Sequence, residues 1–132
     1  MADAHIYIYG VIDYWQDNNA QEWGYVNLKD VKNQFDAQKK DAENIICHIH
    51  SDGGDVDEGF AIHDFLKAQG LPVTTINEGN CHSIASIIFM AGSTRKMNPN
   101  ASLLIHNPWG SAFGESSDIQ KYADKLKEIE EK

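Results

Sequence analysis

The chain has 132 residues, 42% of them hydrophobic and 10% aromatic, which is enough for one domain with a buried core and excludes disorder along most of its length. Its formal net charge of -9 argues against a nucleic-acid partner, because phosphate binding needs a basic surface, and against docking on an anionic membrane. No apolar run approaches the length that spans a bilayer, and the first ten residues lack the basic and apolar regions of a signal peptide.

The first part of the chain predicts two strands with a helix between them. Residues 5–11 (HIYIYGV) are rich in β-branched and aromatic residues and predict a strand, whereas residues 13–24 are polar and irregular and predict a loop or an edge hairpin. Apolar residues at helical spacing predict a helix over residues 27–39. Residues 44–50 (NIICHIH) predict a second strand, whose continuous apolar stretch indicates burial on both faces.

The middle of the chain begins with a glycine turn. Residues 51–55 (SDGGD) place two adjacent glycines directly after the second strand, which predicts a tight turn. A helix is expected from about residue 57 to residue 69, where Gly70 closes it. Residues 73–77 then predict a third strand, and residues 78–81 a short loop.

The last part of the chain predicts two helices around a fourth strand. Residues 83–91 (SIASIIFMA) are apolar almost all round and predict a short buried helix. Residues 102–106 (SLLIH) predict the strand, preceded by a short one over 96–98 and followed by a loop over 107–114. A final helix from Ser117 has an apolar stripe and reaches the end of the sequence without a stop signal, so we expect the chain to be cut inside it.

This alternation of strands and helices predicts a single α/β layered domain over residues 1–132, with a largely parallel sheet. In such sheets, functional sites form at the carboxyl ends of the strands. Three features fall at such ends: the SDGGD turn, the segment before Ser83, and His106. We therefore expect these three features to meet at one edge of the sheet.

Ser83 is a candidate nucleophile because it lies at a strand-to-helix turn. A serine hydroxyl needs a neighbouring base to take its proton, and the backbone N–H of Ile84 could donate to a developing oxyanion. The alternative is that Ser83 only caps the helix. Ser86, one turn further on, is interpreted as a core hydroxyl bonded back to a carbonyl of the preceding turn.

His106 ends a strand and is the candidate general base, because imidazole titrates near neutral pH. The alternative is an ordinary strand-end histidine. His82 adjoins Ser83, but adjacent side chains on a turn diverge, so no productive hydrogen bond is expected. His48 and His50 are expected on one strand face and His63 on a helix surface or core edge. No HExxH or Cys/His pattern occurs, so no metal site is expected.

Gly53 and Gly54 allow close approach of backbone to a ligand, and their N–H groups could form an anion-binding nest. The alternative is an ordinary turn before a helix. A phosphate loop fits poorly, because no GK[ST] follows and the acidic residues around the turn would repel phosphate. Cys47 and Cys81 form no CxxC pair and are interpreted as reduced cysteines of a cytoplasmic protein.

Three segments in the same order resemble ClpP-type serine peptidases. HSDGGDVDEGFAIHDFL resembles their Ser-Pro-Gly-Gly segment and the following helix, GNCHSIASIIFMAGS their nucleophile segment, and NPNASLLIHNPWG the segment with the catalytic histidine. The Asn-Pro-Trp-Gly run and the Trp15 region look most like the phage-encoded branch, the head maturation proteases. The resemblance implies the ClpP/crotonase fold of repeated α/β layers, with a head over about residues 1–114 and the start of a handle helix over about 115–132.

The resemblance also implies a role for each matching residue. Ser83 matches the nucleophile and His106 the base, while Gly54 and Ile84 match the two backbone oxyanion donors. Extended peptide substrate would bind by strand addition along two segments, represented by Gly53, Asp55, Val56, Asn107, Pro108 and Trp109. Family members need no cofactor. They form homo-oligomeric rings of seven subunits that stack, and they work with an ATP-driven unfoldase; phage capsid proteins are further expected partners of the phage branch, in a bacterial or phage-infected host.

The sequence departs from the family pattern at three places. Asp52 stands where the family usually has proline, which implies a looser turn or an unfavourable negative charge near the oxyanion site. His82 replaces a small residue. The third triad member, an acid beyond the handle helix, has no match in this chain, and we expect the 132-residue chain to be nearly inactive while its full-length parent is active.

Two other functions stay open. A non-catalytic ClpP-like assembly subunit would keep the fold with a vestigial site, which Asp52 and the unmatched acid favour. A crotonase-like acyl-CoA enzyme would use the same backbone oxyanion hole without Ser83 or His106, but the acidic SDGGD turn counts against a CoA pocket.

Overall fold

The computed structural model of the protein describes residues 2–14, 24–107 and 110–113. The main sheet has six strands in the order β1-β4-β5-β7-β8, with β6 also paired to β5, and all of its pairings are parallel except β7–β8. Its strands are β1 (Ala2–Tyr9), β4 (Ala42–Ser51), β5 (Val73–His82), β6 (Thr94–Met97), β7 (Ser102–Asn107) and β8 (Gly110–Phe113). The predicted α/β fold with a mostly parallel sheet is therefore confirmed.

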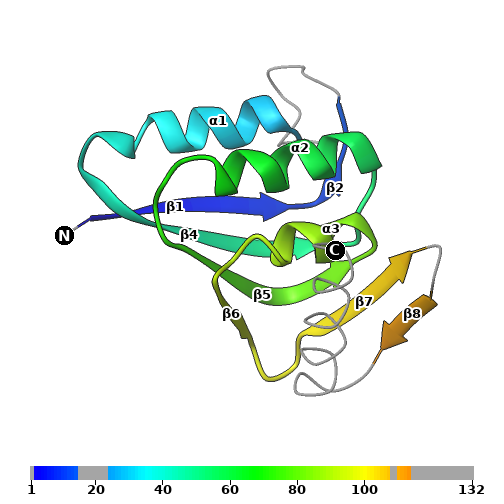
Figure 1. Ribbon diagram of the computed structural model, residues 1–132. Coiled ribbons are helices and arrows are strands. Elements are labelled where there is room, and N and C mark those ends of the chain that lie inside the picture. The colour runs from blue at the N-terminus through cyan, green and yellow to red at the C-terminus, as the bar shows by residue number, and fades with distance from the viewer. Residues whose placement is uncertain (1, 15–23, 108–109, 114–132) are drawn as a thin grey trace, which may run out of the picture.

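A small parallel pair, β2 (Val11–Ile12) and β3 (Tyr25–Val26), lies beside this sheet. The helices are α1 (Leu28–Asp36), α2 (Val56–Lys67) and α3 (Ile84–Phe89), with a short 3-10 turn, η2 (Lys39–Asp41). Figure 1 shows α1 and α2 side by side over β1 and β4, with α3 against β5 and β7. The predicted handle helix lies outside the described residues.

The sheet is buried on the face that carries the helices. Ala4, Ile6 and Ile8 of β1 are buried, and the residues between them are exposed. The strand β4 follows the same pattern, because its buried residues alternate with the half-buried His48 and the exposed His50. The expected burial of residues 44–50 on both faces is therefore wrong, whereas the expected placing of His48 and His50 on one strand face is confirmed.

Local hydrogen bonds explain where the two longer helices begin. Asn27 caps α1 by accepting the Asp30 N–H at 2.8 Å, and Asp55 caps α2 by accepting the Glu58 N–H at 2.7 Å. The Glu58 carboxylate also accepts the Leu28 N–H at 2.7 Å, which joins the starts of the two helices. Both helices are confirmed with shorter spans than predicted, and beyond α2 Gly70 has a φ of +73°, as a glycine that closes a helix requires.

The strand β5 is longer than predicted, and the loop expected over residues 78–81 is wrong. These residues continue the strand because they bond to β4: the Glu78 carboxylate lies 2.7 Å from His48 Nδ1, and the Asn80 N–H donates to His50 Nδ1 at 3.0 Å. The loop predicted over residues 107–114 is wrong in part as well, because β7 extends through Asn107 and residues 110–113 form β8.

The open face of the sheet carries a polar and aromatic cluster. The rings of Tyr7 and His48 stack with centroids 4.4 Å apart. The Tyr9 hydroxyl donates to Glu78, and this hydrogen bond together with burial raises the pKa of Tyr9 to about 12. Burial alone would raise the pKa of Glu78, but its hydrogen bonds with Tyr9 and His48 outweigh burial and lower it. The cluster therefore holds the last part of β5 to β1 and β4.

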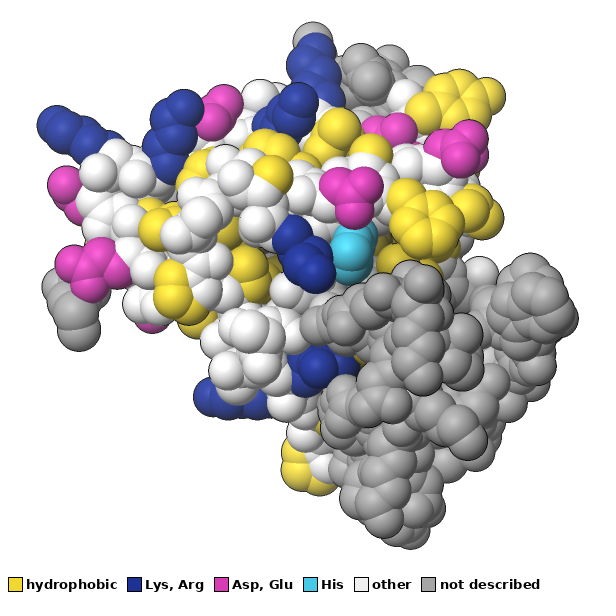
Figure 2. Space-filling model, viewed as in Figure 1, with side chains coloured by type: hydrophobic (Ala, Val, Ile, Leu, Met, Phe, Trp, Pro, Cys, Tyr) yellow, Lys and Arg dark blue, Asp and Glu magenta, His cyan; other side chains and the backbone are white. Residues whose placement is uncertain are grey.

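The helix face has a mixed surface. Figure 2 shows basic and acidic side chains interspersed on it, with exposed apolar side chains near the start of α2. There Val56 and Phe60 are 53% and 45% exposed. Val56 follows the SDGGD turn directly and Phe60 lies one helical turn further on, so this apolar surface adjoins the edge of the sheet where the candidate site lies.

Both cysteines are fully buried, and burial raises the pKa of the Cys47 and Cys81 thiols well above its usual range. A raised pKa keeps the thiol protonated and unreactive. We therefore expect neither thiol to react with Ellman's reagent in the native protein at mildly alkaline pH, and both to react in denaturant. Stoichiometric reaction of the folded protein, followed by absorbance, would contradict this burial.

Candidate active site

The ends of β4 and β5 and the strand β7 bring the three sequence features together. The Ser83 N–H donates to the Leu104 carbonyl of β7 at 2.9 Å, which ties the end of β5 to β7. On the other side, a Cβ added to Gly53 would lie 2.9 Å from Ser83 Cβ and 2.8 Å from the His82 carbonyl oxygen. Only glycine allows this approach, so the glycine turn is in direct contact with the Ser83 segment.

Ser83 has an unusual backbone conformation. Its φ of 56° and ψ of -129° make it the one non-glycine residue with positive φ in the described part of the chain. It stands where a capping residue of α3 would stand, but its side chain makes no capping hydrogen bond, so the capping alternative is wrong. Conformations of this kind cost about 1–3 kcal/mol and cluster at functional sites.

Ser86 is buried, and its hydroxyl donates to the Ser83 carbonyl at 2.5 Å. The interpretation of Ser86 as a core hydroxyl bonded to the preceding turn is therefore confirmed. This bond also fixes the carbonyl of Ser83.

The two expected oxyanion donors belong to the glycine turn and to the first residue of α3. Ile12 donates to the Gly53 carbonyl at 2.9 Å and accepts the Asp55 N–H at 2.7 Å, in a parallel bridge centred on Gly54. Because Ile12 bonds to the neighbours of Gly54, the N–H of Gly54 itself points away from Ile12. Within the described ranges, neither this N–H nor that of Ile84 donates a hydrogen bond.

His106 lies in β7, opposite Ser111 of β8. It comes two residues after Leu104, the residue whose carbonyl binds the Ser83 N–H. The strand therefore carries the backbone of His106 past the Ser83 turn, on the side opposite Gly53. Of the expected peptide-binding residues in this segment, Asn107 pairs with Gly110, and Pro108 and Trp109 lie outside the described residues.

The expected peptide-binding residues in and after the glycine turn differ in how many of their polar groups already have partners within the fold. Asp55 uses all its polar groups within the fold: its N–H donates to Ile12, its carbonyl accepts the Gly59 N–H, and its carboxylate caps α2. Gly53 donates to the Ser51 hydroxyl at 3.1 Å. Val56 begins α2 with its side chain 53% exposed.

The other histidines have partners away from Ser83. The His82 ring contacts Asp52 and Ser102, so the expected divergence of His82 from Ser83 is confirmed. His63 lies on α2 and pairs with Asp64 at 2.9 Å, as expected for a helix-surface residue. No group of three or more His, Cys, Asp or Glu side chains among residues 2–14, 24–107 and 110–113 could hold a metal ion.

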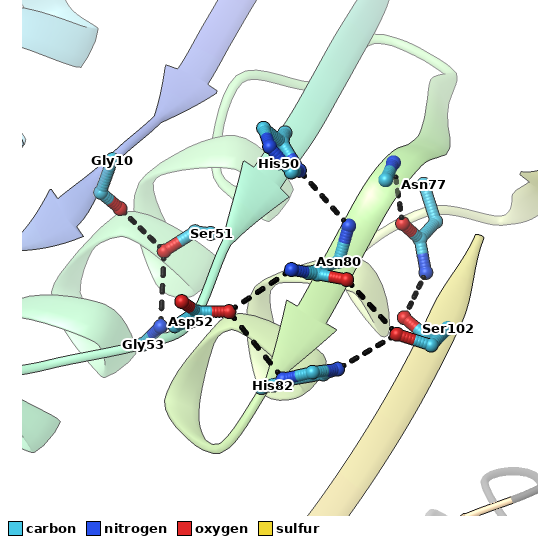
Figure 3. A network of polar contacts seen from close by, with 10 residues as sticks. Gly10, His50, Ser51, Asp52, Gly53, Asn77, Asn80, His82 and Ser102 are labelled. Atoms are coloured by element: carbon cyan, nitrogen blue, oxygen red, sulfur yellow. Dashed lines mark hydrogen bonds and ion pairs between the residues drawn. The ribbon is translucent and has the colours of Figure 1, made fainter.

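A network of polar side chains that sequence reasoning missed surrounds the site (Figure 3). The carboxylate of Asp52 accepts a hydrogen bond from the Asn80 side chain at 3.1 Å and lies 3.4 Å from His82 Nδ1. Ser102 bonds to both Asn80 and His82. The charge of Asp52 thus has partners on β5, which no local pattern reveals because they lie about thirty positions away in the sequence.

In the part of the chain that the structure describes, no helix is both long and apolar enough to cross a membrane.

Comparisons with known proteins identify the family and match the fold. The family model described as Clp protease matches residues 31–132. Among solved structures, ClpP1 from Listeria monocytogenes is 25% identical with a TM-score of 0.63, over 93% of this chain and 67% of that one. A point mutant of the same ClpP1 is 26% identical with a TM-score of 0.64, over 96% of this chain. The chain spans 65% of the length of that mutant structure.

Proposed function

Because the chain belongs to the Clp protease family, we propose that it is a serine endopeptidase that cleaves peptide bonds through an acyl-enzyme on Ser83. The observation that carries the proposal is the backbone of Ser83, which adopts a strained conformation against the Gly53 turn without capping α3. Within the described residues that hydroxyl makes no capping hydrogen bond, and a nucleophile needs an unoccupied hydroxyl.

His106 serves as the base in this mechanism. It takes the proton of the Ser83 hydroxyl while the oxygen attacks the carbonyl carbon of the scissile peptide bond. The negative charge then develops on the former carbonyl oxygen, which accepts hydrogen bonds from the N–H groups of Gly54 and Ile84. His106 passes its proton to the leaving amine, the C–N bond breaks, and water attacks the resulting ester with the same base.

The two N–H groups suit this role because the fold leaves them without a described partner. Removing one such donor costs on the order of 10² to 10³ in kcat in other serine peptidases. An acid that orients the base contributes on the order of 10⁴ in kcat. We assign no residue to that third position, so the Ser83–His106 pair and the two amides are the complete proposed site.

An extended peptide would add as a strand along the segments that flank Ser83. On one side these are Gly53 and Val56, with a smaller contribution from Asp55 because its polar groups are engaged. On the other side they are Asn107, Pro108 and Trp109. The same proposal includes assembly into stacked homo-oligomeric rings and work with an ATP-driven unfoldase or on capsid proteins. It also includes membership of the phage head maturation branch and a cytoplasmic location. All of these rest on the sequence resemblance.

Labelling with a fluorophosphonate, followed by peptide mapping, tests the proposal. The probe esterifies an activated serine, and we expect the label on the peptide that contains Ser83, taken up more slowly by the 132-residue chain than by a full-length parent that supplies the orienting acid. The control is the urea-unfolded protein, which retains every serine but has no site and should not react. A folded protein that takes up no label, or takes it up at several serines alike, would contradict the peptidase and favour the non-catalytic assembly subunit.

A further inference from the structure

Four polar side chains next to Ser83 form a closed ring of contacts (Figure 3). Asp52 Oδ1 lies 3.1 Å from Asn80 Nδ2, and Asn80 Oδ1 lies 2.9 Å from Ser102 Oγ. Ser102 Oγ lies 2.8 Å from His82 Nε2, and His82 Nδ1 lies 3.4 Å from Asp52 Oδ1. The four residues come from the turn after β4, the end of β5 and the start of β7, so the ring joins three segments of the site.

The hydrogens of three of these contacts follow from what each group can donate. An ionised carboxylate only accepts, so the NH₂ of Asn80 faces Asp52 and its carbonyl oxygen faces Ser102. The Ser102 hydroxyl must then donate its one hydrogen to Asn80. Because that hydrogen is used, the Ser102 oxygen accepts from His82, which places a hydrogen on Nε2 of the His82 ring.

The fourth contact is an ion pair that depends on the charge of His82, since Nδ1 lies 3.4 Å from the Asp52 carboxylate. A neutral ring with its hydrogen on Nε2 satisfies the three hydrogen bonds but directs the lone pair of Nδ1 toward the carboxylate. Protonation of Nδ1 makes His82 an imidazolium ion, whose positive charge then lies beside Asp52.

We propose that Asp52 and His82 are positioning residues, which together hold the Gly53–Gly54 turn in place against Ser83 when His82 is protonated. This inference rests on the proposed function of Ser83. His82 directly precedes Ser83 in the sequence, and Asp52 directly precedes Gly53. Contact between Asp52 and His82 therefore links the nucleophile segment to the oxyanion turn. The Gly53 N–H is held in turn by the Ser51 hydroxyl, which donates to the Gly10 carbonyl at 2.6 Å.

The other charged groups on this face have their own partners. Glu78 of β5 binds His48 of β4 and Tyr9 of β1. His50 of β4 accepts the Asn80 N–H, and the β7 residue that contacts His82, Ser102, is uncharged. Asp52 is thus the carboxylate that contacts the His82 ring in the described part of the chain.

Nuclear magnetic resonance tests the ring of contacts without any use of catalysis. We expect the Gly53 and Gly54 amide signals to move together with the nitrogen shifts of His82 when its ring gains or loses a proton. In Asp52→Asn, the glycine signals should no longer follow His82. The matched control is Asp64→Asn, which removes the carboxylate of the other close histidine pair, His63–Asp64, on α2. Glycine signals that ignore His82 in the parent protein, or that respond equally to both substitutions, would overturn the inference.

The rate of Ser83 labelling tests the link to chemistry. The carboxylate of Asp52 is 76% exposed, and exposed ion pairs are worth little, so we expect Asp52→Asn to slow labelling about two- to fivefold where the nitrogen shifts show His82 to be protonated. The ratio of parent to variant rates should fall to about 1 where those shifts show that the ring has lost its proton. A ratio that does not change with pH would show a merely structural role for Asp52 and would overturn the inference.

The two experiments separate the possible failures. Absence of labelling in the parent protein would contradict the proposed peptidase, and the glycine signals would still decide whether Asp52 and His82 position the turn. Labelling at Ser83 together with glycine signals that ignore His82 would keep the peptidase and overturn the positioning pair. His82→Gln, which keeps a donor toward Ser102 but cannot carry charge, should label at the rate of Asp52→Asn.

Discussion

Ser83→Ala is expected to abolish fluorophosphonate labelling and, in a parent chain with a complete triad, to lower peptide hydrolysis by on the order of 10⁶ in kcat, the loss known for the nucleophile of another serine peptidase. The reason is that Ser83 is the proposed nucleophile, on a segment that contacts the Gly53 turn on one side and bonds to β7 on the other. The fold should survive, since the Ser83 side chain makes no capping bond. Labelling, peptidase assay and urea unfolding of the same preparation measure all three expectations.

Ser86→Ala is the matched control for that substitution. It removes a hydroxyl one helical turn away, whose bond to the Ser83 carbonyl is a structural contact. Such a bond contributes about 0.5–1.5 kcal/mol, so we expect a small loss of stability and labelling within about tenfold of the parent. Equal labelling of the parent and Ser83→Ala, or loss of labelling only in Ser86→Ala, would assign the nucleophile to a different residue.

Gly54→Ala is expected to cause the second large effect, on stability and on the site together. A Cβ at this position would lie 2.0 Å from the Ile12 carbonyl oxygen, and the backbone has a φ of +146°. The clash must break the two hydrogen bonds between Ile12 and the turn. Adding those bonds to the backbone strain gives a loss of about 2–6 kcal/mol in the free energy of unfolding. Displacement of the Gly54 N–H should also slow Ser83 labelling by at least about 10².

Gly70→Ala separates the clash from the backbone strain. Gly70 also has a positive φ, of +73°, but nothing lies within 4 Å of a Cβ added there. We expect a loss of about 1–2 kcal/mol from the left-handed conformation alone, with labelling unchanged. Urea unfolding of both variants gives the comparison. If Gly54→Ala loses no more stability than Gly70→Ala, the close packing of β2 on the turn is not what holds the oxyanion segment.

Much of the fold could be predicted because local pattern and tertiary structure agree. The helix α2 follows from its acidic start and its closing Gly70, and β7 follows from its run of apolar residues. The end of β5 could not be predicted in this way. Glu78, Gly79 and Asn80 have the composition of a loop, and they form a strand because β4 supplies partners for their side chains and backbone.

The candidate site, like the fold, could be predicted only in part. The order of the three motifs predicts that the glycine turn and Ser83 meet, and the contact of Gly53 with Ser83 shows that they do. The placing of His106 on β7 also follows from its strand pattern. The pairing of Asp52 with His82 could not be predicted, because each residue is unremarkable within its own segment and only the parallel register of β4 and β5 makes them neighbours.

The positive φ of Ser83 bears on how such a protein would change over evolutionary time. Glycine adopts this region as readily as any other, so a glycine at position 83 would relieve the strain that serine sustains there. Selection for folding alone would therefore favour loss of the hydroxymethyl group. A lineage that had given up hydrolysis but kept its architecture should accumulate glycine at this position, whereas a lineage that retains serine does so against the preference of its own backbone.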